Sequence, residues 1–242
     1  MQRDNNCQTC PSARVCPWVP LEPADRRALE RIMRRPTVLR KGKELFRAGQ
    51  SLRGLYIVRS GCVKAWNVTE TGEEYVLRFY MTGEVVGLGA IAEGRYDCNA
   101  TALDTSSMCE LPFRDFQRAA EERPALNHVL LRLMSREILQ EERLGLLKGN
   151  KSASARIAGF LCHLADGFDQ RGFSSQEFNL AMGRREIAEF LGLALETVCR
   201  TLTQFGHQGM IEVEGRHIVL HDRGRLNALA QCSTGGGGSG PH

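Results

Sequence analysis

Residues 125–148, ALNHVLLRLMSREILQEERLGLLK, form the stretch around which the rest of the chain is organised. This stretch contains no proline and is rich in leucine, arginine, glutamate and methionine, which all favour helix. Pro124 stands where a helix can begin, and Gly149 and Asn150 stand where one can end. We therefore predict one long helix between these two points.

The predicted helix carries two apolar stripes. The first can pack on the helix's own domain and comprises Leu126, Val129, Leu130, Leu133, Leu144 and Leu147. The second has the spacing of a coiled-coil seam and comprises Leu131, Met134, Ile138, Glu141 and Gly145. Glu141 would meet its own copy across a two-fold axis, and Gly145 offers no side chain, so this seam predicts a weak homodimer that suits a switch. The alternative from the helix alone is a buried helix with a salt-bridged surface.

The composition is that of a folded protein with room for two domains. The chain has 242 residues, of which 42% are hydrophobic and 25% are charged. No apolar run reaches the roughly 20 residues of a membrane span, and residues 1–6 do not resemble a signal peptide, so we expect a cytoplasmic protein without a membrane partner. The net charge of +4 is small, and nucleic-acid binding would therefore need a local patch.

Three of the nine cysteines, Cys7, Cys10 and Cys16, lie within ten residues of one another. A C-x2-C pair can reach one metal centre from a tight loop, and a third thiol follows after five residues. In a reducing compartment such spacing indicates a metal site, with unstructured free thiols as the alternative. The spacing does not decide between zinc and an iron–sulfur cluster. The candidates for a fourth ligand are Cys62, Cys98, Cys109, Cys162, Cys199 and Cys232, of which Cys62 and Cys162 have the apolar neighbours of core residues.

The segment from residue 36 to 122 has a β pattern in which glycines recur about every ten residues. Short alternating runs lie between these glycines, and regular turns between short strands indicate a sandwich or roll. The recurring glycines are Gly42, Gly49, Gly61, Gly72, Gly83 and Gly94. The predicted elements are a helix over residues 22–34, strands over residues 54–60, 62–68, 74–80 and 107–112, and helices from Phe113 onward.

Residues 179–205, NLAMGRREIAEFLGLALETVCRTLTQF, carry the pattern of a helix-turn-helix. We predict a first helix at Arg184–Leu191, a turn at Gly192, where a positive φ favours glycine, and a second helix at Leu195–His207. The flanking segments are predicted as a helix over residues 154–168 and a hairpin over residues 210–220, which turns at Glu214 and Gly215 and forms the wing of a winged helix.

The second helix of such a motif places its first side chains in the major groove of DNA. Arginine there pairs with guanine, and glutamate accepts from cytosine. Basic residues at the start of the first helix would contact phosphates, although a solvated helix start looks the same in sequence. The predicted base-contact residues are Glu196, Thr197, Cys199 and Arg200, and the predicted phosphate-contact residues are Arg184 and Arg185.

Residues 54–91, GLYIVRSGCVKAWNVTETGEEYVLRFYMTGEVVGLGAI, resemble the sensor roll of the CRP/FNR family of bacterial transcription regulators. In the cyclic-nucleotide members of that family, a glutamate that holds the ribose follows the first glycine of the segment that reads Gly87-Leu88-Gly89 here. About ten residues later, an Arg-Ser pair holds the phosphate. Leu88 replaces the glutamate, and residues 95–99, RYDCN, contain no Arg-Ser pair. The resemblance therefore does not imply cyclic-nucleotide sensing.

The chain is more similar to the FNR-type, oxygen-responsive branch of the family. In that branch a C-x2-C-x5-C segment and one cysteine of the roll bind a [4Fe-4S] cluster, and the segment matches Cys7, Cys10 and Cys16. The fourth cysteine lies in a motif like M-x-C-E-I-P-F, which reads SMCELPF at residues 107–113 here. The resemblance thus implies Cys109 as the fourth ligand and favours iron–sulfur over zinc, with Cys98 as the rival.

The resemblance also implies an α+β fold and a mechanism. The cluster would promote homodimerisation and binding to a palindromic promoter site on double-stranded DNA without oxygen, and RNA polymerase would be a further partner. Family members carry E-T-[IV]-x-R in the second helix, and FNR-type readers usually have serine where this chain has Cys199. The Cys199 thiol either only occupies the position of that serine or is an oxidisable group on the DNA-reading surface. The expected parts are a cysteine segment (1–20), a β-roll sensor domain (21–123), a dimerisation helix (124–149), a winged helix-turn-helix (150–231) and a linker-like tail (232–242).

Three alternatives use the same residues differently. One is a CRP-like regulator with a small-molecule effector in the roll, and another is a structural zinc site of four cysteines. The third is a redox enzyme, which would need convergent acid–base residues. The six histidines are scattered and match no catalytic pattern, so we do not expect an enzyme.

Overall fold

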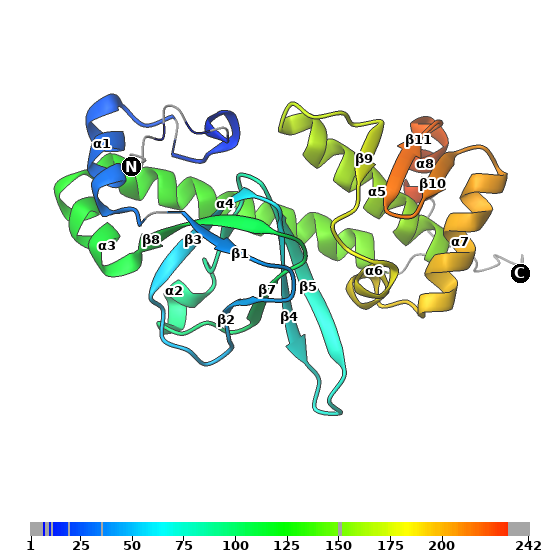
Figure 1. Cartoon of the computed structure of the whole chain (residues 1–242), viewed down its shortest axis with the longest axis horizontal. Coiled ribbons are helices and arrows are strands. Elements are labelled where there is room, and N and C mark those ends of the chain that lie inside the picture. Colours follow the sequence, from blue (N-terminus) through cyan, green and yellow to red (C-terminus); the bar gives the residue numbers. More distant parts are fainter. Residues whose placement is uncertain are drawn as a thin grey trace, which may run out of the picture. The chain divides into compact units, whose positions relative to one another are not determined.

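The computed structural model describes residues 7, 10, 12–18, 20–34, 36–149 and 152–231. The chain divides into two compact units, Met1–Leu139 and Gln140–His242, and each is described by itself (Figure 1). Cys232 and the tail after it lie outside the described residues. Within the described part of the chain, no helix is both long and apolar enough to cross a membrane.

The N-terminal unit is built on two antiparallel four-stranded sheets, with strand orders β1-β8-β3-β6 and β2-β7-β4-β5. The first sheet contains β1 (Thr37–Leu39), β8 (Ser106–Pro112), β3 (Gly54–Ser60) and β6 (Val85–Val86). The second contains β2 (Glu44–Phe46), β7 (Asn99–Ala102), β4 (Cys62–Val68) and β5 (Glu74–Met81), and a short helix, α2 (Ala90–Glu93), precedes β7. The prediction of a β-roll is confirmed. The strands absent from the prediction have four residues or fewer, too few for alternation to be visible in sequence.

The recurring glycines make the turns between strands. All six have a positive φ, a conformation that L side chains rarely adopt. Gly61, between β3 and β4, also has no room for a side chain, because an added Cβ would lie 2.4 Å from the Ser106 Oγ. That hydroxyl in turn accepts from the backbone N–H of Cys62 at 3.1 Å. The glycine pattern is therefore a requirement of the roll's tight turns.

Three helices cover one side of the N-terminal unit. They are α1 (Pro23–Ile32), α3 (Phe113–Glu122) and the first half of α4 (Pro124–Lys148), and Figure 1 shows α1 and α3 beside α4. Their apolar faces share one core with the roll, because burying nonpolar surface is the main force that holds such layers together. This core includes Trp18, Leu21, Leu29, Leu55, Leu111, Phe116, Leu126 and Val129.

The long helix α4 has the two faces that its sequence predicts. Leu126, Val129, Leu144 and Leu147 of the first stripe are buried, and Leu130 and Leu133 are half-buried. In the second stripe, by contrast, Leu131 is 62% exposed, Met134 37% and Ile138 60%. An apolar stripe left open in this way is typical of a surface that packs against another chain. The alternative of a buried helix with a salt-bridged surface does not account for these exposed apolar side chains.

A buried ion pair ties β5 to α4. The Arg78 guanidinium lies 2.5 Å from the Glu137 carboxylate and 3.4 Å from that of Glu84, and Arg78 is only 4% exposed. The Tyr80 hydroxyl also donates to Glu137 at 3.2 Å. Burial and the nearby Glu137 hold the pKa of Tyr80 well above its usual value. The hydroxyl thus stays a donor, and the roll holds α4 through charge as well as through apolar packing.

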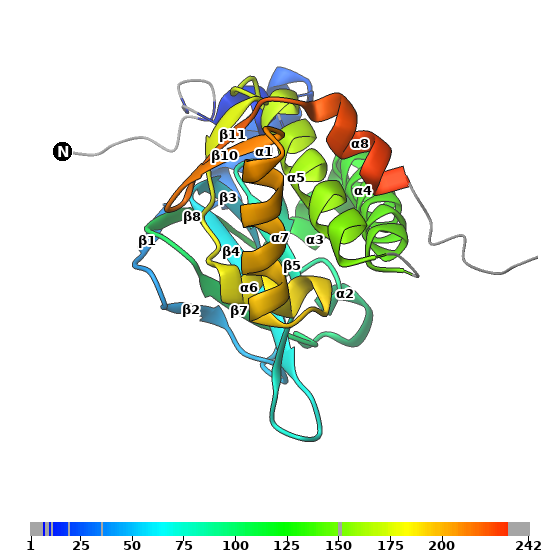
Figure 2. The same cartoon turned by 90° about the vertical axis from the view of Figure 1, so that its right-hand side faces the viewer.

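The C-terminal unit is a winged helix-turn-helix, and Figure 2 shows its helices and hairpin together. The bounds of α6 (Arg184–Leu191) and α7 (Leu195–His207) confirm the prediction, as does the hairpin of β10 (Ile211–Glu214) and β11 (His217–Leu220). Helix α5 (Ala153–Gln170) is slightly longer than predicted. Two elements were not predicted: β9 (Glu177–Asn179), which pairs with β11, and α8 (Arg223–Gln231), which packs on α5.

Candidate cofactor site and nucleic-acid interface

Four thiols gather in the N-terminal unit: Cys7, Cys10, Cys16 and Cys109, here called the four-thiol site. Burial raises the pKa of the Cys7 thiol to about 12, and the neighbouring Cys16, Glu30, Cys109 and Cys10 raise it further. Burial likewise raises the pKa of Cys109 to about 11, with contributions from Cys10 and Cys16. Cys7, Cys16 and Cys109 also pack against the same hydrophobic core, so these thiols lie in one region of the unit.

The cysteine segment is anchored to three parts of the unit. The Cys7 backbone N–H donates to the Glu30 carboxylate of α1 at 3.1 Å. The Ser12 hydroxyl donates to the carbonyl of Arg59 in β3. A short 3-10 helix, Ala13–Val15, follows, and it lies so close to the turn at Gly83 that an added Cβ there would be 2.7 Å from the carbonyl of Val15. The roll therefore holds the segment in place through specific contacts.

Cys98 lies apart from the four-thiol site. It packs against the inner core of the roll with Phe46 and Val58, whereas Cys7, Cys16 and Cys109 pack against the core shared with α1, α3 and α4. Burial raises the pKa of Cys98 to about 12, and the next contribution comes from Asp97. The structure thus brings Cys109, and not Cys98, to the N-terminal thiols. Cys62 and Cys162 are buried as core residues, and Cys199 is exposed on α7.

The donor set of the four-thiol site fits a thiolate-bound centre. Thiolates are the ligands of iron–sulfur clusters and of structural zinc. Burial and neighbouring thiols oppose deprotonation of Cys7 and Cys109. A bound zinc ion or iron–sulfur core, which is positively charged before the thiolates are counted, would offset that opposition. Among the described residues, no three His, Cys, Asp or Glu side chains are arranged to hold a single metal ion.

Helix α7 presents a polar face to solvent. Glu196, Cys199 and Arg200 are exposed, while Val198, Leu202 and Phe205 are buried against the rest of the unit. Thr197, expected on the exposed face with the other three predicted base-contact residues, is instead half-buried. It lies one turn before Thr201, which is only 5% exposed, and so stands at the edge of the buried face. Three of the four predicted base-contact residues are therefore exposed, and the base contacts of all four stay a prediction.

The two arginines at the start of α6 differ. Arg184 is half-buried, and its Nη2 donates to the carbonyl of Gly215 in the wing turn at 3.1 Å. Burial lowers the pKa of this guanidinium, and the nearby Cys199 opposes that effect. Arg185 is exposed. Arg184 thus braces the wing, a role that its position in the sequence did not reveal.

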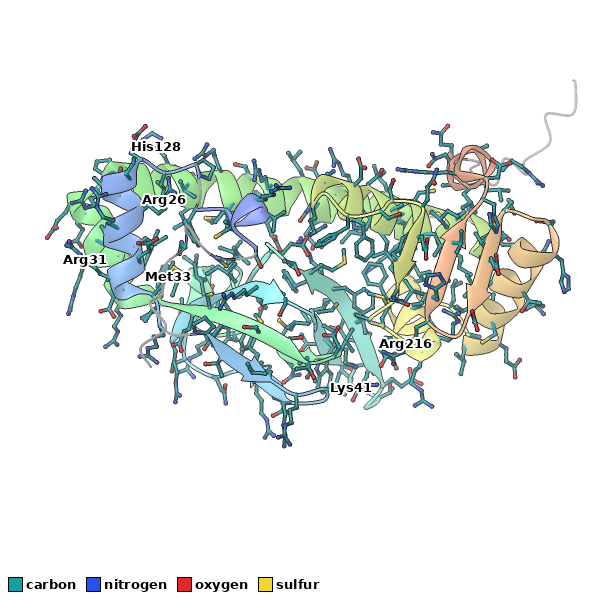
Figure 3. The ribbon with its side chains drawn as sticks, turned by 45° about the horizontal axis from the view of Figure 1, so that its top comes forward. Arg26, Arg31, Met33, Lys41, His128 and Arg216 are labelled. Carbon is teal, nitrogen blue, oxygen red and sulfur yellow. The ribbon has the colours of Figure 1, made fainter. Side chains whose placement is uncertain are left out.

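Sequence reasoning missed Arg216, an exposed basic residue in the turn of the wing (Figure 3). Its Nη1 donates to the carbonyl of Ala181, just before α6, at 3.0 Å. The signal for it was present, since Arg216 directly follows the Gly215 of the predicted hairpin turn. Wing turns and the start of the first helix are where backbone phosphates are contacted in such motifs, so Arg216 joins Arg184 and Arg185 as a phosphate-contact candidate.

Comparisons with known proteins cover both units. Two family models match: a cyclic nucleotide-binding domain over residues 36–123 and a Crp-like helix-turn-helix domain over residues 155–229. The chain is 41% identical over 225 residues to the transcriptional activator protein anr of Pseudomonas aeruginosa, covering 93% of this chain and 92% of that protein. It is 38% identical to the fumarate and nitrate reduction regulatory protein of Escherichia coli, covering 93% and 90%. The structure of FixK2 from Bradyrhizobium japonicum matches with a TM-score of 0.74 and 29% identity, covering 83% and 98%.

Proposed function

Since this chain belongs to the CRP/FNR family of transcription regulators, we propose that it senses oxygen through a [4Fe-4S] cluster held by the four-thiol site. Its likeness to named FNR-type activators makes it a DNA-binding regulator of that type. The observation that carries the finer proposal is the gathering of Cys109 with the three N-terminal thiols. A bound cluster would supply a centre that oxygen degrades.

The route from the four-thiol site to the dimer seam runs through packing within the N-terminal unit. Cys7, Cys16 and Cys109 pack against the core that also contains Leu126 and Val129 of α4. Leu126 and Val129 lie on the buried stripe of α4. The exposed stripe, which carries the seam residues, lies beside it. A cysteine segment held by its ligands would therefore stiffen the part of α4 that carries the seam. Loss of the ligands would release that constraint.

Dimerisation would set the geometry of DNA binding. Two chains would pair along Leu131, Met134 and Ile138, the exposed apolar part of the seam. Each dimer would then present two copies of α7, one for each half of a palindromic site about one DNA turn, roughly 34–36 Å, apart. A monomer would make half the phosphate and base contacts and bind weakly. RNA polymerase is the partner proposed for the DNA-bound dimer.

The test of the cluster uses two matched serine variants. We expect the wild-type chain, purified without oxygen, to hold about four irons and four sulfides and to be brown. Cys109→Ser should lose most of both, because it removes a ligand, whereas Cys98→Ser should keep them, because Cys98 lies in the other core. Iron and sulfide assays and visible spectra measure this before and after air is admitted. A colourless wild-type protein with one zinc, or equal losses in both variants, would contradict the proposal.

The seam is tested by Glu141→Ala. Glu141 is exposed, and at a two-fold seam it would face its own copy, so its removal should relieve a like-charge repulsion. We expect the dimer in air to become tighter by roughly tenfold or more, about 1.4 kcal/mol per tenfold, and DNA binding in air to rise with it. Analytical ultracentrifugation measures the first effect. Glu122→Ala, at the end of α3, is the control, and a Glu141 variant that stays monomeric would refute the seam.

A further inference from the structure

Two buried N–H groups near Cys16 have no acceptor among the described residues: the indole Nε1 of Trp18 and the Nε of Arg26. Trp18 is only 1% exposed, and its ring packs 5.9 Å from that of Phe116. The Arg26 guanidinium is satisfied at its other end, where Nη2 donates to the carbonyl of Leu21 at 3.1 Å. Buried donors in folded proteins are nearly always paired, so two exceptions near the same cysteine call for an explanation.

Both donors belong to the surroundings of the four-thiol site. Trp18 follows Cys16 by two residues, its backbone N–H donates to the Cys16 thiol, and its side chain shares a core with Cys7 and Cys109. Arg26 lies close enough for its charge to act on Cys16 as well. It stands on α1, which Figure 3 shows beside α4. The missing acceptor is therefore to be sought among the sulfurs of this site.

The other tryptophan of the chain, Trp66, has a hydrogen-bond acceptor for its indole N–H. Trp66, in β4, donates its Nε1–H to the Thr101 hydroxyl at 2.9 Å. The chain has only these two tryptophans, and both lie in the N-terminal unit. Among the described residues, only the tryptophan beside the cysteines thus lacks an acceptor for its indole N–H, and the two tryptophans offer a matched comparison.

We propose that the indole N–H of Trp18 and the Nε–H of Arg26 donate hydrogen bonds to sulfur atoms of the cluster held by the four-thiol site. The inference rests on the proposed function. Sulfur atoms of a cluster bound by four thiolates carry negative charge and accept hydrogen bonds, and such bonds, with burial, set the stability and potential of the centre. The guanidinium also brings a positive charge to an anionic centre. Trp18 and Arg26 are then positioning residues that determine how long the cluster survives in air.

The first test compares Trp18→Phe with Trp66→Phe. Each variant keeps an aromatic ring and loses one indole N–H. After anaerobic purification, we expect both to hold as much iron and sulfide as the wild-type chain. In Trp18→Phe alone, the iron–sulfur stretching bands in resonance Raman spectra should shift and lose their sensitivity to D2O. The visible absorbance of that variant should also decay in air roughly 10-fold faster or more, by analogy with the loss of metal affinity when a hydrogen-bond partner of the metal ligands is removed.

The second test covers the case in which Trp18→Phe does not fold. Arg26→Lys keeps the charge and removes the Nε donor, and Arg27→Lys makes the same change at the exposed neighbour on α1. We expect the Raman shift and faster decay in Arg26→Lys only. If the wild-type chain holds a cluster and neither the Trp18 variant nor the Arg26 variant differs from its control, this inference is overturned while the proposed function stands. A wild-type chain without iron would overturn both.

Discussion

Replacing Arg78 with methionine should lower the free energy of unfolding of the N-terminal unit by about 3–5 kcal/mol, the range found when one partner of a buried ion pair is removed. The Arg78 guanidinium lies between the carboxylates of Glu137 and Glu84. Without it, both carboxylates would stay partly desolvated with no cation between them. Urea unfolding followed by tryptophan fluorescence measures the effect, since both tryptophans, Trp18 and Trp66, report on this unit.

Two further variants separate the buried pair from a general effect of losing an arginine. Arg47→Met removes an ion pair with Glu44 on the exposed surface, where solvent screens the charges, and it should change stability far less. Adding Glu137→Leu to Arg78→Met should recover part of the loss, because an apolar pair can replace a buried ion pair. If Arg78→Met costs no more than Arg47→Met, the pair does not hold α4 to the roll.

Replacing Arg200 with alanine should have the largest effect on DNA recognition. Arg200 is exposed near the start of α7, where an arginine can pair with guanine through two hydrogen bonds. The loss should be about 1–3 kcal/mol for each copy of α7, or roughly 2–6 kcal/mol for a dimer on a palindromic site. Fluorescence anisotropy without oxygen measures it, with a duplex that the wild-type protein selects from a random library and a scrambled duplex of the same length.

Arg185→Ala is the matched comparison for Arg200→Ala. Arg185 is exposed at the start of α6, and a contact with phosphate carries no sequence information. Its loss should weaken binding to both duplexes alike and lower the slope of affinity against salt by about 1 for each contact. Arg200→Ala should instead affect mainly the selected duplex. Equal weakening of both duplexes by Arg200→Ala would place that arginine on phosphate and refute the base contact.

Local signals in the sequence were enough to predict the elements that are long or that are bounded by proline or glycine. Helix α4 and the helices α6 and α7 follow from apolar spacing and from Pro124 and Gly192, because these features act within one or two turns of helix. The longer strands of the roll follow from glycines that only tight turns require. The C-x2-C-x5-C spacing identified three thiols of the candidate site in the same way, since neighbouring residues share one loop.

Only the tertiary structure decided what depends on residues far apart in the chain. The residue types left six candidates for a fourth ligand, and the family resemblance favoured Cys109. In the structure, β8 pairs with β3, and this pairing places Cys109 near the N-terminal thiols. Cys98 lies in the other core of the roll. The short strands β1, β2, β6, β7 and β9 exist because longer neighbours pair with them. The N–H groups of Trp18 and Arg26 that have no acceptor in the described part of the chain are likewise invisible in sequence, because burial and hydrogen bonding are properties of packed side chains.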